Sequence, residues 1–286
     1  MQPYHPEPVL IEDFITRCLA EDIGSGDVTT LACIDPTSRS KGKLLVKDVG
    51  IIAGIELAEA IFRHVDPTVE FEFFHRDGDA VHDGDVAFFV ECHTHALLQA
   101  ERLVLNSMQR MSGIATLTNR FLFEVEDLPV QLLDTRKTTP GIRFLEKWAV
   151  NLGGGSNYRF GLYDWFMIKD NHIEACGTVT DAIEQVAAYQ QKHGLNLNVT
   201  VEVKNLMELF EVLDTGKVTR IMFDNFELPL LKEGVRLVNK RFETEASGGV
   251  NLQTVRKIAQ TGVDYISIGA LTHSAQALDM SLKIID

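Results

Sequence analysis

Residues 199–225 read VTVEVKNLMELFEVLDTGKVTRIMFDN, with two short apolar runs, 199–203 and 220–223, on either side of a helical stretch. A strand, a helix and a second strand in this order indicate parallel strands that a crossover helix connects. Glu202 and Asp224 each lie at the end of an apolar run, so their side chains would project at the rim of the sheet. The stretch therefore predicts an α/β fold with acidic groups where two strands end.

The same alternation of apolar runs and helical stretches continues from Pro129 onward. The other runs that we interpret as strands are residues 130–133, 165–168, 241–245 and 265–268. Polar residues or glycines follow every run, as they do where an α/β barrel builds an active site on one rim. Six runs in all predict a barrel smaller than the usual eight-stranded form.

The first third of the chain has the mixed pattern of a small α+β domain. Helical spacing covers residues 9–20 and 55–64, and strand-like segments cover residues 43–48, 69–74 and 85–91. Residues 95–126 are predicted as one long helical region, broken or bent near Ser112-Gly113, where we place the domain boundary. The expected domains are 1–113 and 114–286, with the C-terminal segment able to return to the first domain.

The composition excludes several classes of protein. A formal net charge of -14 argues against non-specific binding to nucleic acid or to an anionic membrane. The four cysteines form no CxxC pair, so neither a disulfide framework nor a zinc site is expected. Residues 1–6 lack a basic region followed by an apolar run, and no long uncharged apolar stretch occurs elsewhere. A cytoplasmic protein is the resulting expectation.

A cluster of cations near the glycine triplet 153–155 runs against this acidic balance. Its members are Arg136, Lys137, Arg143, Lys147, Arg159 and Lys169. The only acids in the stretch are Glu146 and Asp164, so six cations minus two acids leave +4. Gathered cations repel one another unless an anion compensates them, which predicts a site for a small polyanion. Arg143 and Lys147 fall on the predicted helix 142–150 and are expected to be solvated or structural.

Two consecutive late loops carry glycines that favour phosphate binding. Ser247-Gly248-Gly249 precedes a helical stretch at 252–260, and Gly269-Ala270 follows the last strand. Free backbone N–H groups at such positions bind phosphate, and late barrel loops are the usual place for it. The alternative is that these glycines only permit tight turns.

The rim carboxylates and Lys169 each allow two interpretations. Glu202 and Asp224 could hold Mg²⁺ together with substrate phosphates or stabilise a developing cation, or they could neutralise nearby Lys and Arg structurally. Lys169 could form a Schiff base or serve as a permanent cation against a carboxylate or phosphate. For Arg102, on the long helical region, the default interpretation is a solvated surface charge.

Together these segments resemble the quinolinate phosphoribosyltransferase family. The matching stretches are residues 21–29, 101–116, 134–141, 153–155, 168–172, 245–249 and 269–274. The resemblance implies an N-terminal α/β sandwich and a C-terminal incomplete α/β barrel, in a homodimer or a higher oligomer. It also implies a Mg²⁺-dependent pentosyltransferase, which converts quinolinate and phosphoribosyl pyrophosphate to nicotinate mononucleotide, pyrophosphate and CO2.

The same resemblance assigns roles to individual residues. Quinolinate and the phosphates would be bound by Arg136, Lys137, Tyr158, Arg159, Lys169 and His172. Arg102 would reach in from the other subunit, against its default interpretation. Glu202 and Asp224 would serve the ribose and Mg²⁺, with Lys137 and Lys169 also in the catalytic set. A phosphate would be held by Ser247, Gly248, Gly249, Gly269 and Ala270.

One residue departs from the family pattern. Where the family usually reads Asn-His-Arg, this chain has Asn157-Tyr158-Arg159. Tyrosine can donate a hydrogen bond but stays neutral at pH 7, so it cannot replace a protonatable imidazole. The alternatives that the sequence leaves open are a related phosphoribosyltransferase-like protein associated with molybdenum transport, a lyase or aldolase that uses Lys169, and a non-catalytic sensor of phosphoribosyl ligands.

Overall fold

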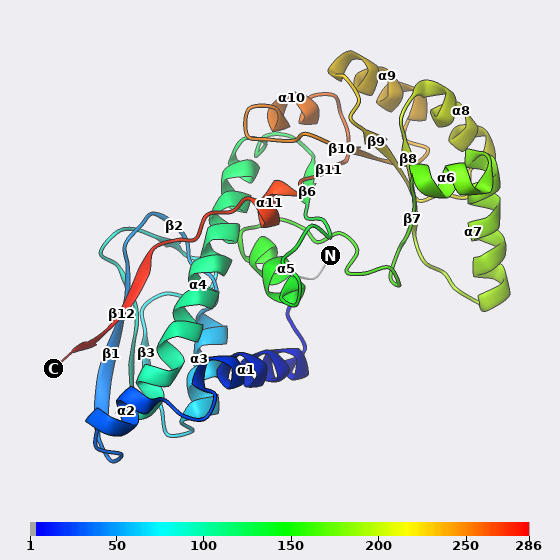
Figure 1. Ribbon diagram of the computed structural model, residues 1–286. Coiled ribbons are helices and arrows are strands. Elements are labelled where there is room, and N and C mark those ends of the chain that lie inside the picture. The colour runs from blue at the N-terminus through cyan, green and yellow to red at the C-terminus, as the bar shows by residue number, and fades with distance from the viewer. Residues whose placement is uncertain (1–3, 286) are drawn as a thin grey trace. The chain divides into compact units, whose positions relative to one another are not determined.

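The computed structural model describes residues 4–285 and divides into two compact units (Figure 1). Of the described residues, the first unit contains those up to Asn119, Thr138–Gly154 and those from Ser274 onward. The second unit contains Arg120–Lys137 and Gly155–His273. This division differs from a single boundary at residue 113, because a segment from the middle of the chain belongs to the first unit.

The first unit is built on a four-stranded sheet in the order β12-β1-β5-β3. Its strands are β1 (Arg39–Val46), β3 (Glu70–Phe73), β5 (Val86–His93) and β12 (Met280–Ile285). All three pairings are antiparallel, and the short strands β2 (Gly50–Ile51) and β4 (Ala80–Val81) form a separate pair. The last strand of the chain thus lies beside the first, so the C-terminal segment is part of this unit.

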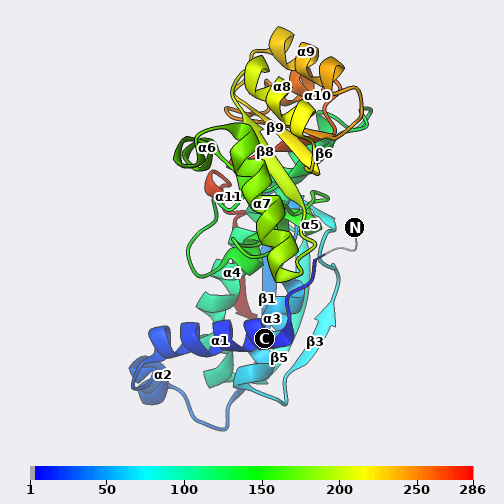
Figure 2. The same cartoon turned by 90° about the vertical axis from the view of Figure 1, so that its right-hand side faces the viewer.

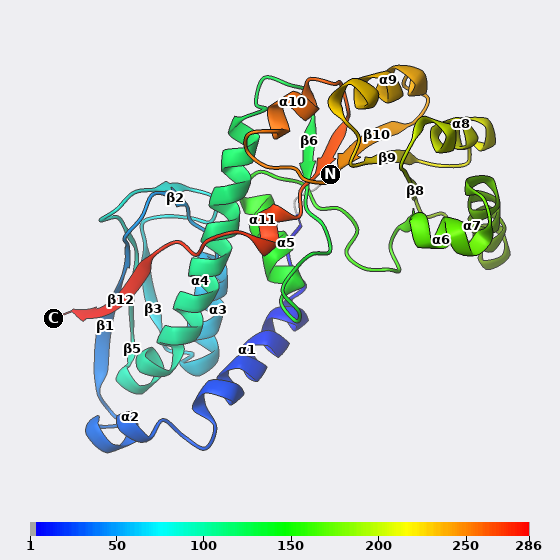
Figure 3. The same cartoon turned by 45° about the horizontal axis from the view of Figure 1, so that its top comes forward.

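Five helices accompany this sheet, and they are α1 (Pro8–Ile23), α2 (Val28–Cys33), α3 (Ile55–Val65), α4 (Thr94–Phe123) and α5 (Arg143–Leu152). Helices α3 and α4 lie on one face of the sheet (Figures 1 and 3). Close packing there depends on Gly42 of β1, because a Cβ atom at this position would lie 3.1 Å from Leu97 Cδ1 of α4. A sheet covered by helices on one face is the predicted α/β sandwich.

Helix α4 runs without interruption from Thr94 to Phe123, so the predicted break or bend near Ser112-Gly113 is wrong. Glycine at 113 serves packing instead, because a Cβ atom there would lie 1.9 Å from the carbonyl oxygen of Gln276. Ser112 accepts a hydrogen bond from the backbone N–H of Ala53 at 2.8 Å. The two residues therefore dock other segments of the first unit against an unbroken helix.

Helix α5 belongs to the first unit because its aromatic side chains pack there. The Trp148 ring lies 4.9 Å from the His5 ring, and the Phe144 ring lies 5.8 Å from that of Phe14. Lys147 is fully buried and Arg143 donates a hydrogen bond to Thr138 Oγ1 at 3.0 Å. Of the two expected roles, solvated or structural, Lys147 therefore has the structural one.

The second unit contains six parallel strands in the order β6-β11-β10-β9-β8-β7. Their bounds are Gln131–Leu133 (β6), Phe166–Ile168 (β7), Val199–Val203 (β8), Arg220–Asp224 (β9), Glu243–Ser247 (β10) and Tyr265–Ser267 (β11). Strands β6 and β7 are the two edges of this sheet. The connection between them passes through α5 in the first unit, which accounts for the open side of the predicted incomplete barrel.

Helices α7 (Val179–His193), α8 (Leu206–Thr215) and α9 (Leu228–Val238) follow one another along the outer side of the strands (Figures 2 and 3). The shorter helices are α6 (Asp170–Cys176), α10 (Val255–Ala259) and α11 (Ala270–His273). Asn205 caps α8 by accepting a hydrogen bond from the backbone N–H of Glu208 at 3.0 Å. No helix within residues 4–285 has both the length and the apolar character needed to cross a membrane.

One strand begins two residues later than predicted. The apolar pattern placed it at 241–245, whereas β10 covers Glu243–Ser247. Asn239 and Lys240 have φ angles of 49° and 58°, and these left-handed residues turn the chain out of α9. Arg241 therefore still belongs to the turn, and its backbone N–H donates to the carbonyl of Val238 at 3.1 Å.

Candidate active site

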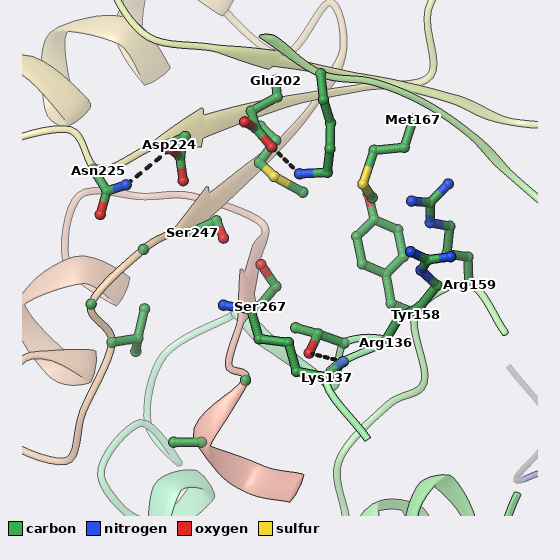
Figure 4. A pocket seen from close by; sticks show the side chains of 18 of the residues that line it. Arg136, Lys137, Tyr158, Arg159, Met167, Glu202, Asp224, Asn225, Ser247 and Ser267 are labelled. Atoms are coloured by element: carbon green, nitrogen blue, oxygen red, sulfur yellow. Dashed lines mark hydrogen bonds and ion pairs between the residues drawn. The ribbon is translucent and has the colours of Figure 1, made fainter. Parts of the chain in front are cut away.

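The carboxyl ends of the six strands surround a pocket of about 770 Å³ (Figure 4). It is lined by most of the residues predicted for the site, namely Arg136, Lys137, Tyr158, Arg159, Lys169, Glu202, Asp224, Ser247, Gly248, Gly249, Gly269 and Ala270. All of them belong to the second unit. Folding thus gathers residues from six separate strand ends, as the rim interpretation predicts.

Acidic groups and Lys169 occupy one side of the pocket. Glu202, from β8, is 7% exposed and forms an ion pair with the Lys169 ammonium group. Asp224 ends β9 and accepts a hydrogen bond from Asn225 Nδ2 at 2.9 Å. An amine held as an ammonium group by a carboxylate is a poor carbonyl nucleophile. This geometry favours the permanent-cation interpretation of Lys169 over the Schiff base.

The opposite side of the pocket is cationic and carries Arg136, Lys137 and Arg159 (Figure 4). Burial lowers the pKa of Arg159, and the nearby Arg136 charge lowers it further. The two guanidinium groups therefore repel each other, and an anionic ligand between them would relieve that repulsion.

Two buried hydrogen-bond networks hold the cationic loops in place. Asp134 follows β6, and its carboxylate accepts from the Tyr158 backbone N–H at 2.8 Å and from Asn157 Nδ2 at 2.6 Å. Thr272 Oγ1 donates to the Lys137 carbonyl oxygen at 2.9 Å. The cations thus stand on anchored backbone, so little ordering is needed when a ligand binds.

The glycines of the late loops differ in how strongly the structure excludes a side chain at their positions. Gly248 has φ 99°, and a Cβ atom there would lie 2.1 Å from Asn225 Oδ1. Gly269 is less restricted, since the nearest atom to its Cβ position is Lys137 Cδ at 2.9 Å, on a flexible side chain. Glycine is therefore demanded at 248 both by backbone conformation and by the close approach of Asn225.

The glycine triplet 153–155 lies among the cations in sequence but does not belong to the pocket that brings several of them together. Gly153 ends α5 in the first unit, and a Cβ atom there would lie 2.4 Å from the Ala115 carbonyl oxygen of α4. No triplet residue lines the pocket at the strand ends. At Gly153 the small residue permits close helix packing.

Two residues assigned by resemblance lie outside this pocket. His172 caps α6, where its Nδ1 accepts a hydrogen bond from the Lys169 backbone N–H at 3.0 Å. Arg102 lies on α4 in the first unit and lines a smaller pocket of about 270 Å³ with Glu21 and Asp22. The chain therefore brings neither side chain into the pocket of the second unit by itself.

Several lining residues were not singled out from the sequence. They are Thr135, Met167, Met222, Asn225, Val250, Ser267 and His273. Three of them lie on a strand two positions before a predicted site residue at or just beyond the strand end, since Met167 precedes Lys169, Met222 precedes Asp224 and Ser267 precedes Gly269. Side chains two apart on a strand share a face, so this alternation was a usable signal.

The carboxylates suit a metal ion that a substrate brings with it. Mg²⁺ is usually bound through one or two carboxylates together with substrate phosphates and water. Glu202 and Asp224 provide two carboxylates in one pocket, while residues 4–285 contain no group of three or more acidic, His or Cys side chains arranged for a metal. The residues present therefore fit Mg²⁺ held mainly by a polyphosphate.

The two parts of the chain match two models of one protein family. The model of the quinolinate phosphoribosyl transferase C-terminal domain matches residues 114–283, and that of the N-terminal domain matches residues 27–112. The chain is 50% identical to quinolinate phosphoribosyltransferase [decarboxylating] 1 of Nicotiana glauca, over 99% of this chain and 84% of that protein. It is 40% identical to a probable nicotinate-nucleotide pyrophosphorylase [carboxylating] of Bacillus subtilis, over 96% of this chain and 93% of that protein.

Solved structures agree with these sequence matches. The crystal structure of NadC from Streptococcus pyogenes superimposes with a TM-score of 0.93 at 37% identity, over 99% of this chain and 100% of that chain. A nicotinate-nucleotide pyrophosphorylase from Francisella tularensis gives a TM-score of 0.93 at 32% identity, over 100% of this chain and 99% of that one. The resemblance found in the motifs is thereby confirmed over the full length of the chain.

Proposed function

Because this chain belongs to the quinolinate phosphoribosyltransferase family, we infer that it transfers the phosphoribosyl group of phosphoribosyl pyrophosphate to quinolinate. The products are nicotinate mononucleotide, pyrophosphate and CO2. The observation that carries this function is the pocket itself, in which a cationic side faces an acidic side at the strand ends. A dianionic aromatic acid and a sugar that develops positive charge need these two complementary surfaces.

We propose that Arg136, Lys137 and Arg159 bind the quinolinate carboxylates and orient the ring nitrogen toward the anomeric carbon. The nitrogen lone pair forms the new C–N bond as the bond to pyrophosphate breaks, so positive charge grows on the ribose. Glu202 and Asp224 stabilise this charge electrostatically, and the ion pair with Lys169 holds the Glu202 carboxylate in place. Mg²⁺, when bound with the co-substrate, would neutralise charge on the departing pyrophosphate.

Decarboxylation follows from the charge on the alkylated ring. The carboxylate next to the ring nitrogen leaves as CO2, its bonding electrons remain on the ring carbon beside the cationic nitrogen, and that carbon then takes up a proton. No covalent bond to the protein is required. The protein's contribution is positioning and charge neutralisation, which are the large effects available to such a site.

The test is release of CO2 from quinolinate labelled in its carboxyl groups, with and without phosphoribosyl pyrophosphate. We expect release only when both substrates and Mg²⁺ are present, and loss of release when a chelator removes the metal. Nicotinate is the matched control because it lacks the carboxyl group that leaves. Absence of CO2 release at saturating substrate would contradict the proposed function.

We further propose a homodimer in which Arg102 of one subunit completes the pocket of the other, with a higher oligomer as an alternative assembly. This proposal is supported by the location of Arg102 on the first unit, since every residue that lines the pocket belongs to the second unit. A symmetric dimer would supply two such completed sites.

Mixing two inactive variants tests this sharing. Arg102→Ala and Arg136→Ala are each expected to be nearly inactive, since each removes a charge from the same anion site. Random mixing makes half of the dimers heterodimers, each with one intact site, so about one quarter of wild-type activity should return. Mixing of Arg136→Ala with Lys169→Ala is the control, because both changes lie in the second unit. If the first mixture stays inactive after subunit exchange, Arg102 does not cross to the partner.

The cellular location is proposed as cytoplasmic. All four cysteines are free thiols in the structure, as expected of a reducing compartment. Some plant relatives carry chloroplastic or mitochondrial in their names. Fractionation of the source cells, with the protein detected by antibody, would test the proposal.

A further inference from the structure

The buried hydroxyl of Thr200 contacts one aromatic residue that lines the pocket, Tyr158, and a second aromatic residue, Trp165, that packs against it. Thr200 of β8 is fully buried, and its Oγ1 lies 2.7 Å from the Tyr158 hydroxyl. The same Oγ1 accepts a hydrogen bond from Trp165 Nε1 at 2.9 Å. Thr200 thus ties two residues of the segment between α5 and β7 to β8.

The hydrogen bonds of these three side chains determine which part of Tyr158 can face a ligand. An indole N–H only donates, so Thr200 Oγ1 accepts from Trp165, and the same hydroxyl forms a second hydrogen bond with the Tyr158 hydroxyl. The Tyr158 hydroxyl therefore faces the barrel interior, while its ring lines the pocket beside Met167 (Figure 4). The pocket meets an aromatic ring at this position and not a polar group.

The surroundings of Tyr158 keep the ring uncharged and in one orientation. Burial raises the pKa of Tyr158 far above its ordinary value, and the Glu245 charge raises it further. The Trp165 ring meets it edge to face, with centroids 5.6 Å apart and planes at 79°. The Arg220 guanidinium lies 5.2 Å from the Tyr158 centroid. The wall is thus rigid, aromatic and neutral.

We propose that Thr200 is a positioning residue for the acceptor substrate, because it holds the Tyr158 ring as the aromatic wall against which the pyridine ring packs. Trp165 supports that wall by packing against the Tyr158 ring. Cations on the same side of the pocket bind the carboxylates, while this wall sets the plane of the ring. The inference rests on the proposed function, since it concerns how the aromatic acceptor is held.

Thr200→Val removes both hydrogen bonds and preserves the side-chain shape. We expect KM for quinolinate to rise about tenfold, the effect of losing one or two hydrogen bonds that orient the wall. KM for phosphoribosyl pyrophosphate should change less than about twofold, because the Thr200 hydroxyl bonds to Tyr158 and Trp165, on the side of the proposed quinolinate site. Thr200→Ser keeps the hydroxyl and should restore most of the quinolinate affinity. A merely structural role would not separate the two substrates.

A double-mutant cycle with Tyr158→Phe locates the role of the tyrosine hydroxyl. If that hydroxyl serves only to anchor the ring to Thr200, Tyr158→Phe should also weaken quinolinate binding, and the double variant should be no worse than Thr200→Val. Additive losses would mean that the hydroxyl contacts substrate, and would overturn the proposal. Equal rises in both KM values after Thr200→Val would overturn it as well.

Calorimetric titration with quinolinate separates this proposal from the proposed function. Wild-type protein that binds quinolinate without releasing CO2 would contradict the transfer reaction, yet the same variants would still test Thr200 through their dissociation constants. We expect those constants to follow the order wild type, Thr200→Ser, Thr200→Val from tight to weak. An unchanged constant for Thr200→Val, with normal folding by circular dichroism, would refute the positioning role.

Discussion

Replacing Arg136 by alanine is expected to lower kcat/KM for quinolinate by about a hundredfold to a thousandfold, equivalent to roughly 3–5 kcal/mol. The reason is that the substrate carboxylate would be enclosed in the pocket without the guanidinium group that neutralises it. The Arg136 charge also lowers the pKa of the neighbouring Arg159, after the effect of burial, so a bound anion would be attracted by two neighbouring cations.

Steady-state kinetics with each substrate varied in turn measure this effect. The matched control is Arg236→Ala, since Arg236 lies on α9 with its side chain 71% exposed and paired with Glu233. Exposed pairs of this kind contribute about 0–1 kcal/mol, so the control should keep nearly all activity. Wild-type kinetics in Arg136→Ala would remove Arg136 from the anion site.

Breaking the buried ion pair inside the barrel is expected to cost about 3–5 kcal/mol of unfolding free energy. Arg220 Nη1 lies 3.1 Å from Glu245 Oε2, and the two side chains are 2% and 0% exposed. Burial raises the pKa of Glu245, and the Arg220 charge opposes that rise. Arg220→Met or Glu245→Leu alone would leave one charge buried without its strongest partner.

The double variant Arg220→Met/Glu245→Leu should regain most of that loss, because two apolar side chains of similar volume need no compensation. Denaturant unfolding in a Trp148→Phe background would be followed by Trp165 fluorescence, so that the signal reports only the second unit. A small effect of Glu245→Leu beside a large effect of Arg220→Met would mean that Glu243, 2.9 Å from Arg220 and 40% exposed, carries the interaction. A double variant as unstable as either single one would contradict the ion-pair explanation.

Local pattern was sufficient for most of the elements and for the acidic and glycine groups of the site. Residues 199–203 are β8 as predicted, and the rim positions of Glu202 and Asp224 follow from the ends of their apolar runs. The family model and the solved structures confirm the α/β class and the family. Both were predictable because the polar residues and glycines that follow each strand are encoded in short sequence segments.

Other features depended on contacts between distant segments. Gly113 permits the close approach of residue 276, and no local pattern distinguishes that glycine from one that breaks a helix. Likewise, His172 follows Lys169 by three residues, yet its ring caps α6 instead of entering the pocket. Sequence proximity to a site residue does not determine direction, because the helix start rotates successive side chains.

The sequence alone determined the α/β class, the family and the cationic and acidic composition of the pocket, because these depend on short motifs and on the residues that follow each strand. The tertiary structure alone decided which cations meet, since Arg136, Lys137, Arg159 and Lys169 line one pocket while Lys147 is buried in the first unit. It also decided the hydrogen-bond partner of the Tyr158 hydroxyl, because Thr200 lies 42 residues away in the chain. A hydrogen bond between residues so distant in sequence leaves no local signal.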